Sequence, residues 1–170
     1  MQIGHYVSAQ VRWGPIAWPG GESDVEACVR LVVALGAGED AAWRQTLTRT
    51  VRDGKRRALF VAEAHGQVAG HGRVVCIDAD PQVEGAAPAG WYLLGLVVDR
   101  AWRRRGIGEA LTRGRIAWVA EQSPRVYYFT GRGNLASQAL HQRLGLQKCQ
   151  EPGFLPGAAR GRTLPAVLPR

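Results

Sequence analysis

A basic turn with two glycines, in the second half of the chain, has the residue types that bind a phosphate. It consists of Arg103, Arg104, Arg105, Gly106, Ile107 and Gly108. The glycines let the main chain approach an anion closely, and the arginines add positive charge beside it. If a helix begins here, its first backbone N–H groups are unpaired and its dipole adds partial positive charge. The turn therefore predicts a pyrophosphate site, although R-x-x-G-x-G alone is also typical of an ordinary basic surface turn.

The elements on either side of this turn favour the phosphate interpretation. Residues 91–98 are almost continuously apolar, which predicts a strand buried on both faces. Residues 107–121 have the apolar spacing of a helix. A strand that runs through a glycine-bearing turn into a helix is the arrangement in which helix N-termini bind phosphates.

The rest of the chain alternates strands and helices. Strands are predicted over 6–13, 58–63, 68–77, 126–130, 146–150 and 163–168, with a loop over 14–21, and helices over 23–36, 40–54 and 134–144. The order β-α-α-β-β-β-α-β-α-β-β predicts an α/β (α+β) fold. We expect one central mixed, twisted sheet of about seven strands flanked by about four helices. The length of 170 residues predicts a single domain.

The net charge of +8 lies entirely in the second half of the chain. Residues 1–90 carry a net charge of −1 and residues 91–170 a net charge of +9. Such an uneven distribution predicts an anionic partner. A nucleic acid ranks last, because the arginines are not interleaved with aromatic residues and no DNA-binding motif is present. No apolar run approaches the roughly 20 residues that span a bilayer, and no signal peptide is visible, so we expect a cytoplasmic protein without a membrane partner.

The three cysteines, Cys28, Cys76 and Cys149, are far apart and lack C-x-x-C spacing. They predict reduced cysteines rather than a disulfide framework or a zinc site. The four histidines are equally scattered, and we expect no metal.

Two segments at a fixed spacing resemble the GNAT superfamily of N-acetyltransferases. Residues 96–111, LVVDRAWRRRGIGEAL, are similar to motif A of that family. Residues 134–146, NLASQALHQRLGL, resemble its motif B, which usually reads N-x-x-S/A-x-x-L-Y-x-x-L-G-F. The predicted order of elements matches as well. The resemblance implies a single GNAT acetyltransferase domain over residues 1–170, with acetyl-CoA as co-substrate.

The resemblance also implies which residues bind acetyl-CoA. The backbone amides of the turn 103–108 hold the CoA pyrophosphate. The exposed backbone of Leu96, Val97 and Val98 pairs with pantetheine and polarises the thioester carbonyl. Asn134 touches the pantetheine arm. It can also serve as the N-cap of the following helix, and the two roles can coexist. Ser137 lies on the same helix face as Asn134 and joins the predicted cofactor-binding residues.

The sequence departs from the family pattern at two positions. The motif B tyrosine that protonates the departing thiolate is His141 here. His141 shares a helix face with Asn134 and Ser137, so we predict a general acid, with a surface or capping histidine as the alternative. Tyr92 stands where protein N-terminal acetyltransferases often have a glutamate base, and it either contacts the acceptor or packs in the core.

For the acceptor, acidic residues in the first half suggest a small cationic amine. Five of them, together with Tyr92, form the predicted substrate-binding set: Glu22, Asp24, Asp78, Asp80 and Glu84. The motifs resemble aminoglycoside acetyltransferases, which implies antibiotic resistance. Because no cysteine lies beside a base, we expect direct attack in a ternary complex. The alternatives are a protein or peptide N-acetyltransferase and a non-catalytic acetyl-CoA-binding module. A homodimer is a further expectation.

Overall fold

A mixed sheet forms the centre of the protein. The computed structural model describes residues 17–79, 82, 87–131, 133–148 and 165–167. Within these residues the sheet has seven strands in the order β1-β2-β3-β4-β5-β7-β6. Only β4 and β5 are parallel among the described neighbours. The strands are β1 (Ala17–Pro19), β2 (Arg57–Ala64), β3 (Gln67–Ile77), β4 (Gly90–Val98), β5 (Val126–Phe129), β6 (Gln147–Lys148) and β7 (Pro165–Val167).

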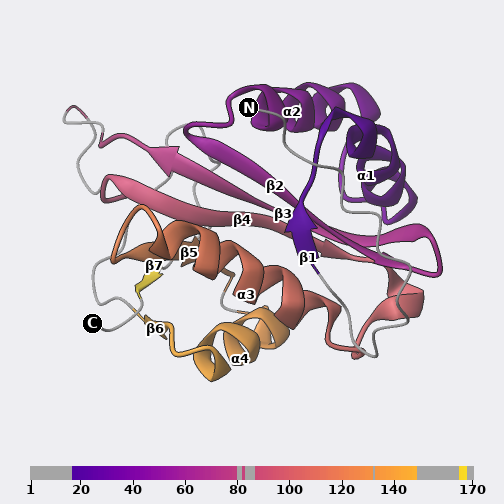
Figure 1. Ribbon diagram of the computed structural model, residues 1–170. Coiled ribbons are helices and arrows are strands. Elements are labelled where there is room, and N and C mark those ends of the chain that lie inside the picture. Colours follow the sequence, from indigo (N-terminus) through magenta and orange to yellow (C-terminus); the bar gives the residue numbers. More distant parts are fainter. Residues whose placement is uncertain (1–16, 80–81, 83–86, 132, 149–164, 168–170) are drawn as a thin grey trace.

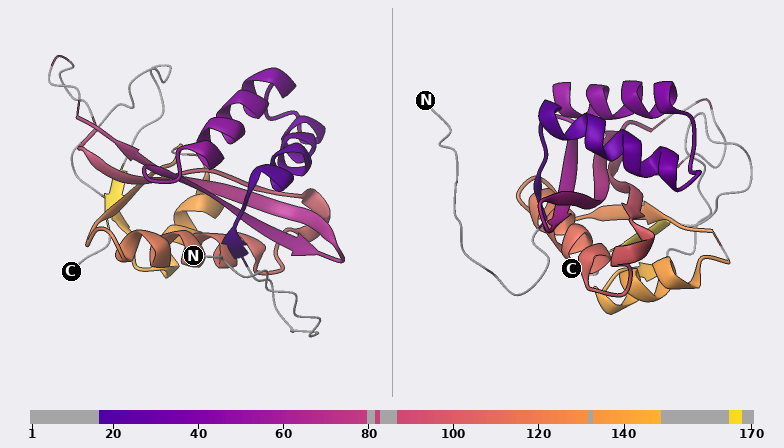
Figure 2. Two further views of the ribbon diagram at one scale, coloured as in Figure 1. Left: turned by 45° about the horizontal axis from the view of Figure 1, so that its top comes forward. Right: turned by 90° about the vertical axis from the view of Figure 1, so that its right-hand side faces the viewer.

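Helices cover both faces of this sheet. Figure 1 shows α1 and α2 above it and α3 and α4 below it, and Figure 2 shows the same layers from two other sides. The described helices are α1 (Glu22–Ala34), α2 (Asp40–Arg52), α3 (Ile107–Ala120) and α4 (Leu135–Arg143), with a 3-10 turn, η1 (Arg100–Trp102). None of these helices is long and apolar enough to cross a membrane.

Each helical layer buries an apolar stripe against the sheet. Val25 and Val29 of α1 and Leu47 of α2 pack on Leu59 and Val61 of β2. On the opposite face, Ile107, Leu111 and Val119 of α3 pack on a second cluster that includes Val74 and Leu93. These α3 residues follow the spacing that puts side chains on one helix face, which explains why the segment is helical and where it docks.

The predicted order of elements and the mixed sheet are confirmed. The first strand is the exception in detail: residues 6–13 lie outside the described residues, and β1 falls in the segment 14–21, which the sequence predicted to be a loop. Ala17–Pro19 pairs with Phe60–Ala62, and the Gly20 N–H donates to the Leu59 carbonyl at 2.8 Å. Tertiary pairing thus overrides the local glycine and proline signals, and Pro19 is tolerated because β1 is an edge strand.

Candidate functional site

The two parallel strands β4 and β5 separate halfway along β4. Their pairing covers Trp91 to Leu93 on β4 and Val126 to Tyr128 on β5. Beyond Leu93, the β5-facing edge of β4 has no strand partner among the described residues up to Val98. An unpaired strand edge offers its N–H and C=O groups to an extended ligand. Leu96, Val97 and Val98, the residues predicted to pair with pantetheine, lie on this edge.

A bulge distorts β4 at the start of this free edge. Leu94 faces Arg73 and Val97 faces His71, so three steps on β4 match two on β3. Gly95 has a φ of +59°, a conformation that favours glycine. Bulges redirect backbone groups and are frequent next to active sites. The bulge here therefore turns the main chain at the point where β4 leaves β5.

Arg115 of α3 holds this bulge from below. Its guanidinium donates to the carbonyls of Leu94 and Arg73, both at 3.4 Å, and to the Thr112 hydroxyl at 3.0 Å. Burial lowers the pKa of Arg115 to about 9, so the group remains protonated at neutral pH. A buried cation, satisfied by carbonyl and hydroxyl oxygens, thus lies at the fork between the two strands.

The turn after β4 forms a cradle at the N-terminus of α3. Gly106, with φ +83°, is the N-cap residue, and α3 begins at Ile107. Arg104 has a φ of +62°, which is unusual and costly for a residue with a side chain. The side chains of Arg103, Arg104 and Arg105 are exposed, and no carboxylate in the described part of the chain pairs with them. Arg103 Nε donates to the Val98 carbonyl at 3.2 Å, and the Arg105 guanidinium lies over the Trp102 ring. A helix N-terminus flanked by arginines without carboxylate partners is the arrangement expected of an anion site.

The free edge, the cradle and α4 converge. A Cβ placed at Gly108 would lie 3.7 Å from Leu140 of α4, 3.8 Å from Val98 and 3.9 Å from Leu96. The predicted cofactor residues Leu96, Val98 and Gly108 are therefore neighbours in space, and α4 packs beside them through Leu140. Asn134 is the N-cap of α4, with its Oδ1 accepting from the Ser137 N–H at 3.1 Å. This is the structural role that the sequence allowed for it.

His141 faces the sheet, with only 4% of its surface exposed. Its Nδ1 lies 2.7 Å from the Ser137 carbonyl oxygen and therefore carries the proton in this contact. Burial, and secondarily the Arg115 charge, lower the pKa of His141 to about 4, against the raising effect of the Ser137 contact. At neutral pH the ring is neutral, and its Nε2 has a lone pair rather than a proton to donate.

The comparisons with known proteins agree with this geometry. Residues 30–146 match the Acetyltransferase (GNAT) family. The chain belongs to the GNAT acetyltransferase family. It is therefore an acyltransferase of the N-acetyltransferase class, and GNAT acetyltransferases use acetyl-CoA. Comparison with curated proteins finds no match for the sequence.

Solved GNAT structures share its fold at low sequence identity. A complex of AAC(6')-Iy with the bisubstrate analogue CoA-S-monomethyl-acetylneamine is 21% identical, with a TM-score of 0.69, covering 86% of this chain and 100% of that one. An aminoglycoside antibiotic 6'-N-acetyltransferase from Acinetobacter haemolyticus is 19% identical, with a TM-score of 0.66 and coverage of 84% and 98%. A ribosomal-protein-alanine N-acetyltransferase from Brucella melitensis is 23% identical, with a TM-score of 0.63 and coverage of 89% and 96%. Such likenesses establish the fold of this GNAT protein.

The residues predicted to bind the acceptor are dispersed, and several already have partners. Glu22 forms an ion pair with Arg52 at 2.9 Å, and Asp78 forms one with Arg56 at 2.7 Å. Asp24 accepts the Gly21 N–H at 2.8 Å and caps α1. The remaining acids, Asp80 and Glu84, lie outside the described residues.

Tyr92 is fully buried in the core. Its ring stacks on Tyr127 and Phe129, and its hydroxyl donates to the Pro88 carbonyl at 2.6 Å. Of the two roles that the sequence left open, the geometry is that of a packing residue. Among the described residues no cluster of three or more His, Cys, Asp or Glu side chains could hold a metal ion.

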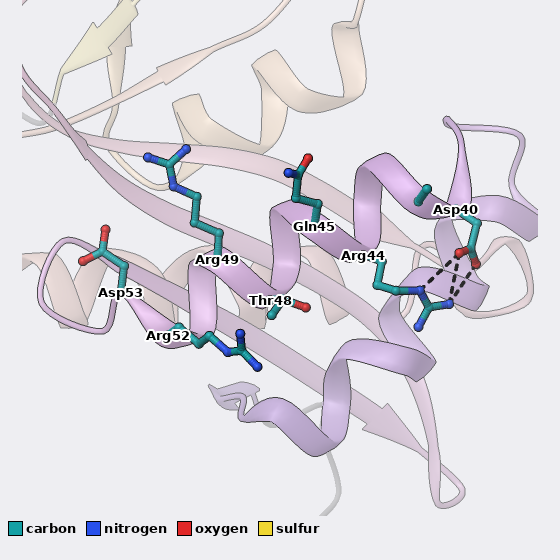
Figure 3. A pocket seen from close by; sticks show the side chains of 8 residues that line it. Asp40, Arg44, Gln45, Thr48, Arg49, Arg52 and Asp53 are labelled. Carbon is teal, nitrogen blue, oxygen red and sulfur yellow. Dashed lines mark hydrogen bonds and ion pairs between the residues drawn. The ribbon is translucent and has the colours of Figure 1, made fainter.

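A hollow of about 860 Å³ lies along α2 (Figure 3). Asp40, Ala41, Arg44, Gln45, Thr48, Arg49, Arg52 and Asp53 line it. Arg44 pairs with Asp40 at 3.0 Å, and Arg52 pairs with Glu22. Its lining belongs to α2 and its C-cap residue Asp53, on the face of the sheet opposite α3.

Sequence reasoning missed the buried polar residues around the bulge, namely His71, Arg73, Arg115 and Tyr128. A signal existed for Arg115, because it occupies the same helical stripe as Ile107, Leu111 and Val119. A signal existed for His71 and Arg73 too, since both interrupt an apolar strand. Tyr128 gave no comparable signal, because an aromatic residue in a strand is ordinary.

Proposed function

We propose that this GNAT protein transfers the acetyl group of acetyl-CoA to a primary amine of a small molecule, by direct attack within a ternary complex. One observation carries the proposal: the unpaired edge of β4 leads directly into the anion cradle at the start of α3. CoA has a pyrophosphate followed by an extended arm with two amides, and the order of these two sites along the chain fits it.

The chain's own groups have distinct roles in this proposal. The amides of Ile107 and Gly108 and the nearby arginines hold the pyrophosphate, and the β4 edge pairs with the pantetheine amides. Bound acetyl-CoA supplies the acyl group as a thioester. The redirected backbone at the bulge provides N–H donors that stabilise negative charge on the carbonyl oxygen under attack. Arg115 keeps the bulge in place.

Direct attack is supported by the environment of Cys28. Burial raises the pKa of Cys28 to about 12, so this thiol is not a nucleophile at neutral pH. It lies in the cluster between α1, α2 and β2, on the face of the sheet opposite α3 and the cradle. Cys149 lies outside the described residues.

The leaving thiolate needs a proton donor, and we assign this role to Tyr128 with His141 beside it. His141 is neutral and its Nδ1 proton is engaged by the Ser137 carbonyl. Burial raises the pKa of Tyr128, so its phenol keeps its proton at neutral pH. The sequence assigned the acid to His141; in this proposal His141 holds the donor in place by stacking on it.

A cationic acceptor such as an aminoglycoside is the substrate suggested by the motifs. It is supported by a hollow of about 570 Å³ between α1 and the β2–β3 hairpin, whose lining includes Asp24, Glu63 and Asp99. Two features weaken it. This hollow lies at the cradle end of β4 rather than at the bulge, and Glu22 and Asp78 are ion-paired with arginines.

The test is a thermal shift with acetyl-CoA, followed by a thiol-release assay over a panel of amines. The panel contains aminoglycosides, linear polyamines, amino acids and peptides with a free N-terminus. We expect acetyl-CoA to raise the unfolding temperature and at least one small amine to increase thiol release. Acetylation of peptides alone would replace the proposal with a peptide acetyltransferase. Binding without turnover of any amine would replace it with a non-catalytic acetyl-CoA-binding module.

A further inference from the structure

Two basic side chains on the upper face of the sheet have buried polar atoms without partners. The side chain of His71 is completely buried, and neither ring nitrogen has a hydrogen-bond partner among the described residues. The Nε of Arg73 is also buried and unpaired there. Both residues face Trp43 of α2: the Arg73 Cζ lies 5.3 Å from the indole centroid, and the His71 ring meets it edge-on at 6.1 Å.

The pair lies beside the bulge of β4. Arg73 faces Leu94 and His71 faces Val97 across the β3–β4 ladder, so the bulge separates their partners. Gly95 leaves room for the arginine, because a Cβ at this position would lie 3.2 Å from the Arg73 Nε. Arg73, Trp43 and Gly95 are each partly exposed, which opens the patch to solvent on the α2 side. The cradle begins α3, which packs on the opposite face.

Among the described residues, Arg73 has no counter-ion. Burial, and then the Arg57 charge, lower the pKa of Arg73 to about 10, so it is still a cation at neutral pH. Burial, Arg73 and Arg115 lower the pKa of His71 to about 4. No carboxylate in the described part of the chain pairs with Arg73, whereas Arg57 pairs with Asp53 at 3.0 Å. Leaving a buried polar group unpaired destabilises the protein, and an unpaired charged group destabilises it more.

We infer that Arg73, beside His71 on the same face of β3, binds a carboxylate of the acceptor. The acceptor is then a small amine that also carries a carboxylate, such as an amino acid. The inference rests on the proposed acetyl transfer, and it replaces the polycationic acceptor with an aminocarboxylate. A guanidinium presents its N–H groups in a planar fork that matches a carboxylate. An anion held on β3 opposite the bulge leaves the amine beside the β4 backbone, where the thioester is expected.

The experiment compares pairs of amines that differ only in the anion. L-amino acids and their C-terminal amides are assayed for acetyl-CoA-dependent thiol release. Comparing phosphoethanolamine with ethanolamine tests whether the site recognises a phosphate instead of a carboxylate. Kanamycin is included as a polycationic amine. We expect the acids to exceed their amides in kcat/KM by about tenfold or more, because a polar site rejects an analogue that lacks its partner.

Variants of two neighbouring arginines separate recognition from folding. Arg73→Gln should remove the preference for the acid and leave the KM for acetyl-CoA within about twofold of its original value, and Arg73→Lys should restore part of the preference. Arg57→Gln, which removes a nearby cation that already has a carboxylate partner, should leave the preference intact. An unchanged acetyl-CoA thermal shift shows that each variant is folded.

Three outcomes would overturn the carboxylate site: equal rates for acids and amides, a preference that survives Arg73→Gln, or acetylation of only kanamycin or phosphoethanolamine. If no amine is acetylated, the proposed function fails. Equilibrium binding of the acids and the amides to the complex of the protein with CoA then tests the carboxylate site separately. Binding of the acids over the amides that disappears in Arg73→Gln would sustain the carboxylate site without catalysis. Equal binding, or none, would refute it.

Discussion

The imidazole of His141 lies flat on the phenol ring of Tyr128, with centroids 3.7 Å apart and planes inclined by 7°. Tyr128 pairs with Leu93 at the last position where β4 and β5 are joined, so the two rings lie at the fork of the sheet. His141 is neutral in this setting, and Tyr128 is protonated. The pair therefore offers a phenol, rather than an imidazolium, as the acid for the departing thiolate.

Tyr128→Phe should lower kcat by at least about tenfold, because it removes the proposed proton donor but keeps the stacked ring. His141→Phe also keeps an aromatic ring on Tyr128, and it should lower kcat less. Acetyl-CoA affinity should change by less than about threefold in both variants. Steady-state kinetics over a range of acetyl-CoA concentrations measure each quantity. A large loss in His141→Phe with normal turnover in Tyr128→Phe would return the acid role to the histidine.

Arg104→Gly should stabilise the fold but weaken acetyl-CoA binding. Arg104 has a φ of +62°, and glycine relieves that strain, with a net gain of up to about 1 kcal/mol. Loss of a cationic side chain at the cradle should raise the Kd for acetyl-CoA several-fold. Arg105→Gly is the matched control, since it removes the same charge at a position without positive φ. Urea unfolding measures the stability of each variant, and calorimetric titration measures its affinity for acetyl-CoA. Equal changes in stability in Arg104→Gly and Arg105→Gly would show that the backbone of Arg104 is not strained.

Arg115→Met should impair catalysis without affecting the cradle. The variant leaves the carbonyls of Leu94 and Arg73 without their guanidinium donor, which costs about 1–3 kcal/mol and loosens the bulge. We expect kcat to fall by about tenfold or more while acetyl-CoA affinity changes little. Arg113→Met, which removes an exposed arginine of the same helix paired with Glu109, is the control. Normal kcat in Arg115→Met would show that the bulge does not depend on this residue.

Folding stability should decrease as the pH falls from about 6.5 towards 4. The pKa values of His71 and His141 are both lowered from 6.5 to about 4 in the folded protein. Between these values the unfolded chain binds more protons than the folded chain, so the free energy of unfolding falls with pH, by up to about 3 kcal/mol for each histidine. His71→Leu should remove about half of this dependence. Urea unfolding at pH 7 and pH 5 tests this, and equal free energies of unfolding at both would contradict it.

The sequence predicted the elements that carry the cofactor site because their signals are local. The apolar strand 91–98, the glycine-bearing turn and the N-cap at Asn134 each depend on a few neighbouring residues, and all three are present. The fork between β4 and β5 and the bulge at Gly95 depend on pairing between distant segments. Gly95 inside the apolar strand is a local signal of a bulge, but no local pattern shows where β4 and β5 separate.

The predicted acidic acceptor set shows the limit of arguments from charge alone. Glu22 and Asp78 are acidic, yet Glu22 pairs with Arg52 at the end of α2 and Asp78 pairs with Arg56 between α2 and β2. A largely buried cation without a carboxylate partner among the described residues is instead Arg73, in the half of the chain with a net charge of −1. A sequence gives the number of charges, and only the fold shows which of them are neutralised.

Acetyl transfer from acetyl-CoA bound at the cradle is tested by the initial rate of thiol release. The rate is measured for the unmodified chain and for Gly106→Ala, with acetyl-CoA and with or without a mixture of primary amines. Gly106 has a φ of +83°, so a Cβ strains the turn that binds the pyrophosphate. We expect the unmodified chain to release thiol only when an amine is present. In Gly106→Ala the rate should fall by about tenfold or more at low acetyl-CoA concentration and recover at high concentration. Acetyl transfer at the cradle would be contradicted if no amine produced thiol release. It would also be contradicted if the rate were the same with and without amine and in Gly106→Ala.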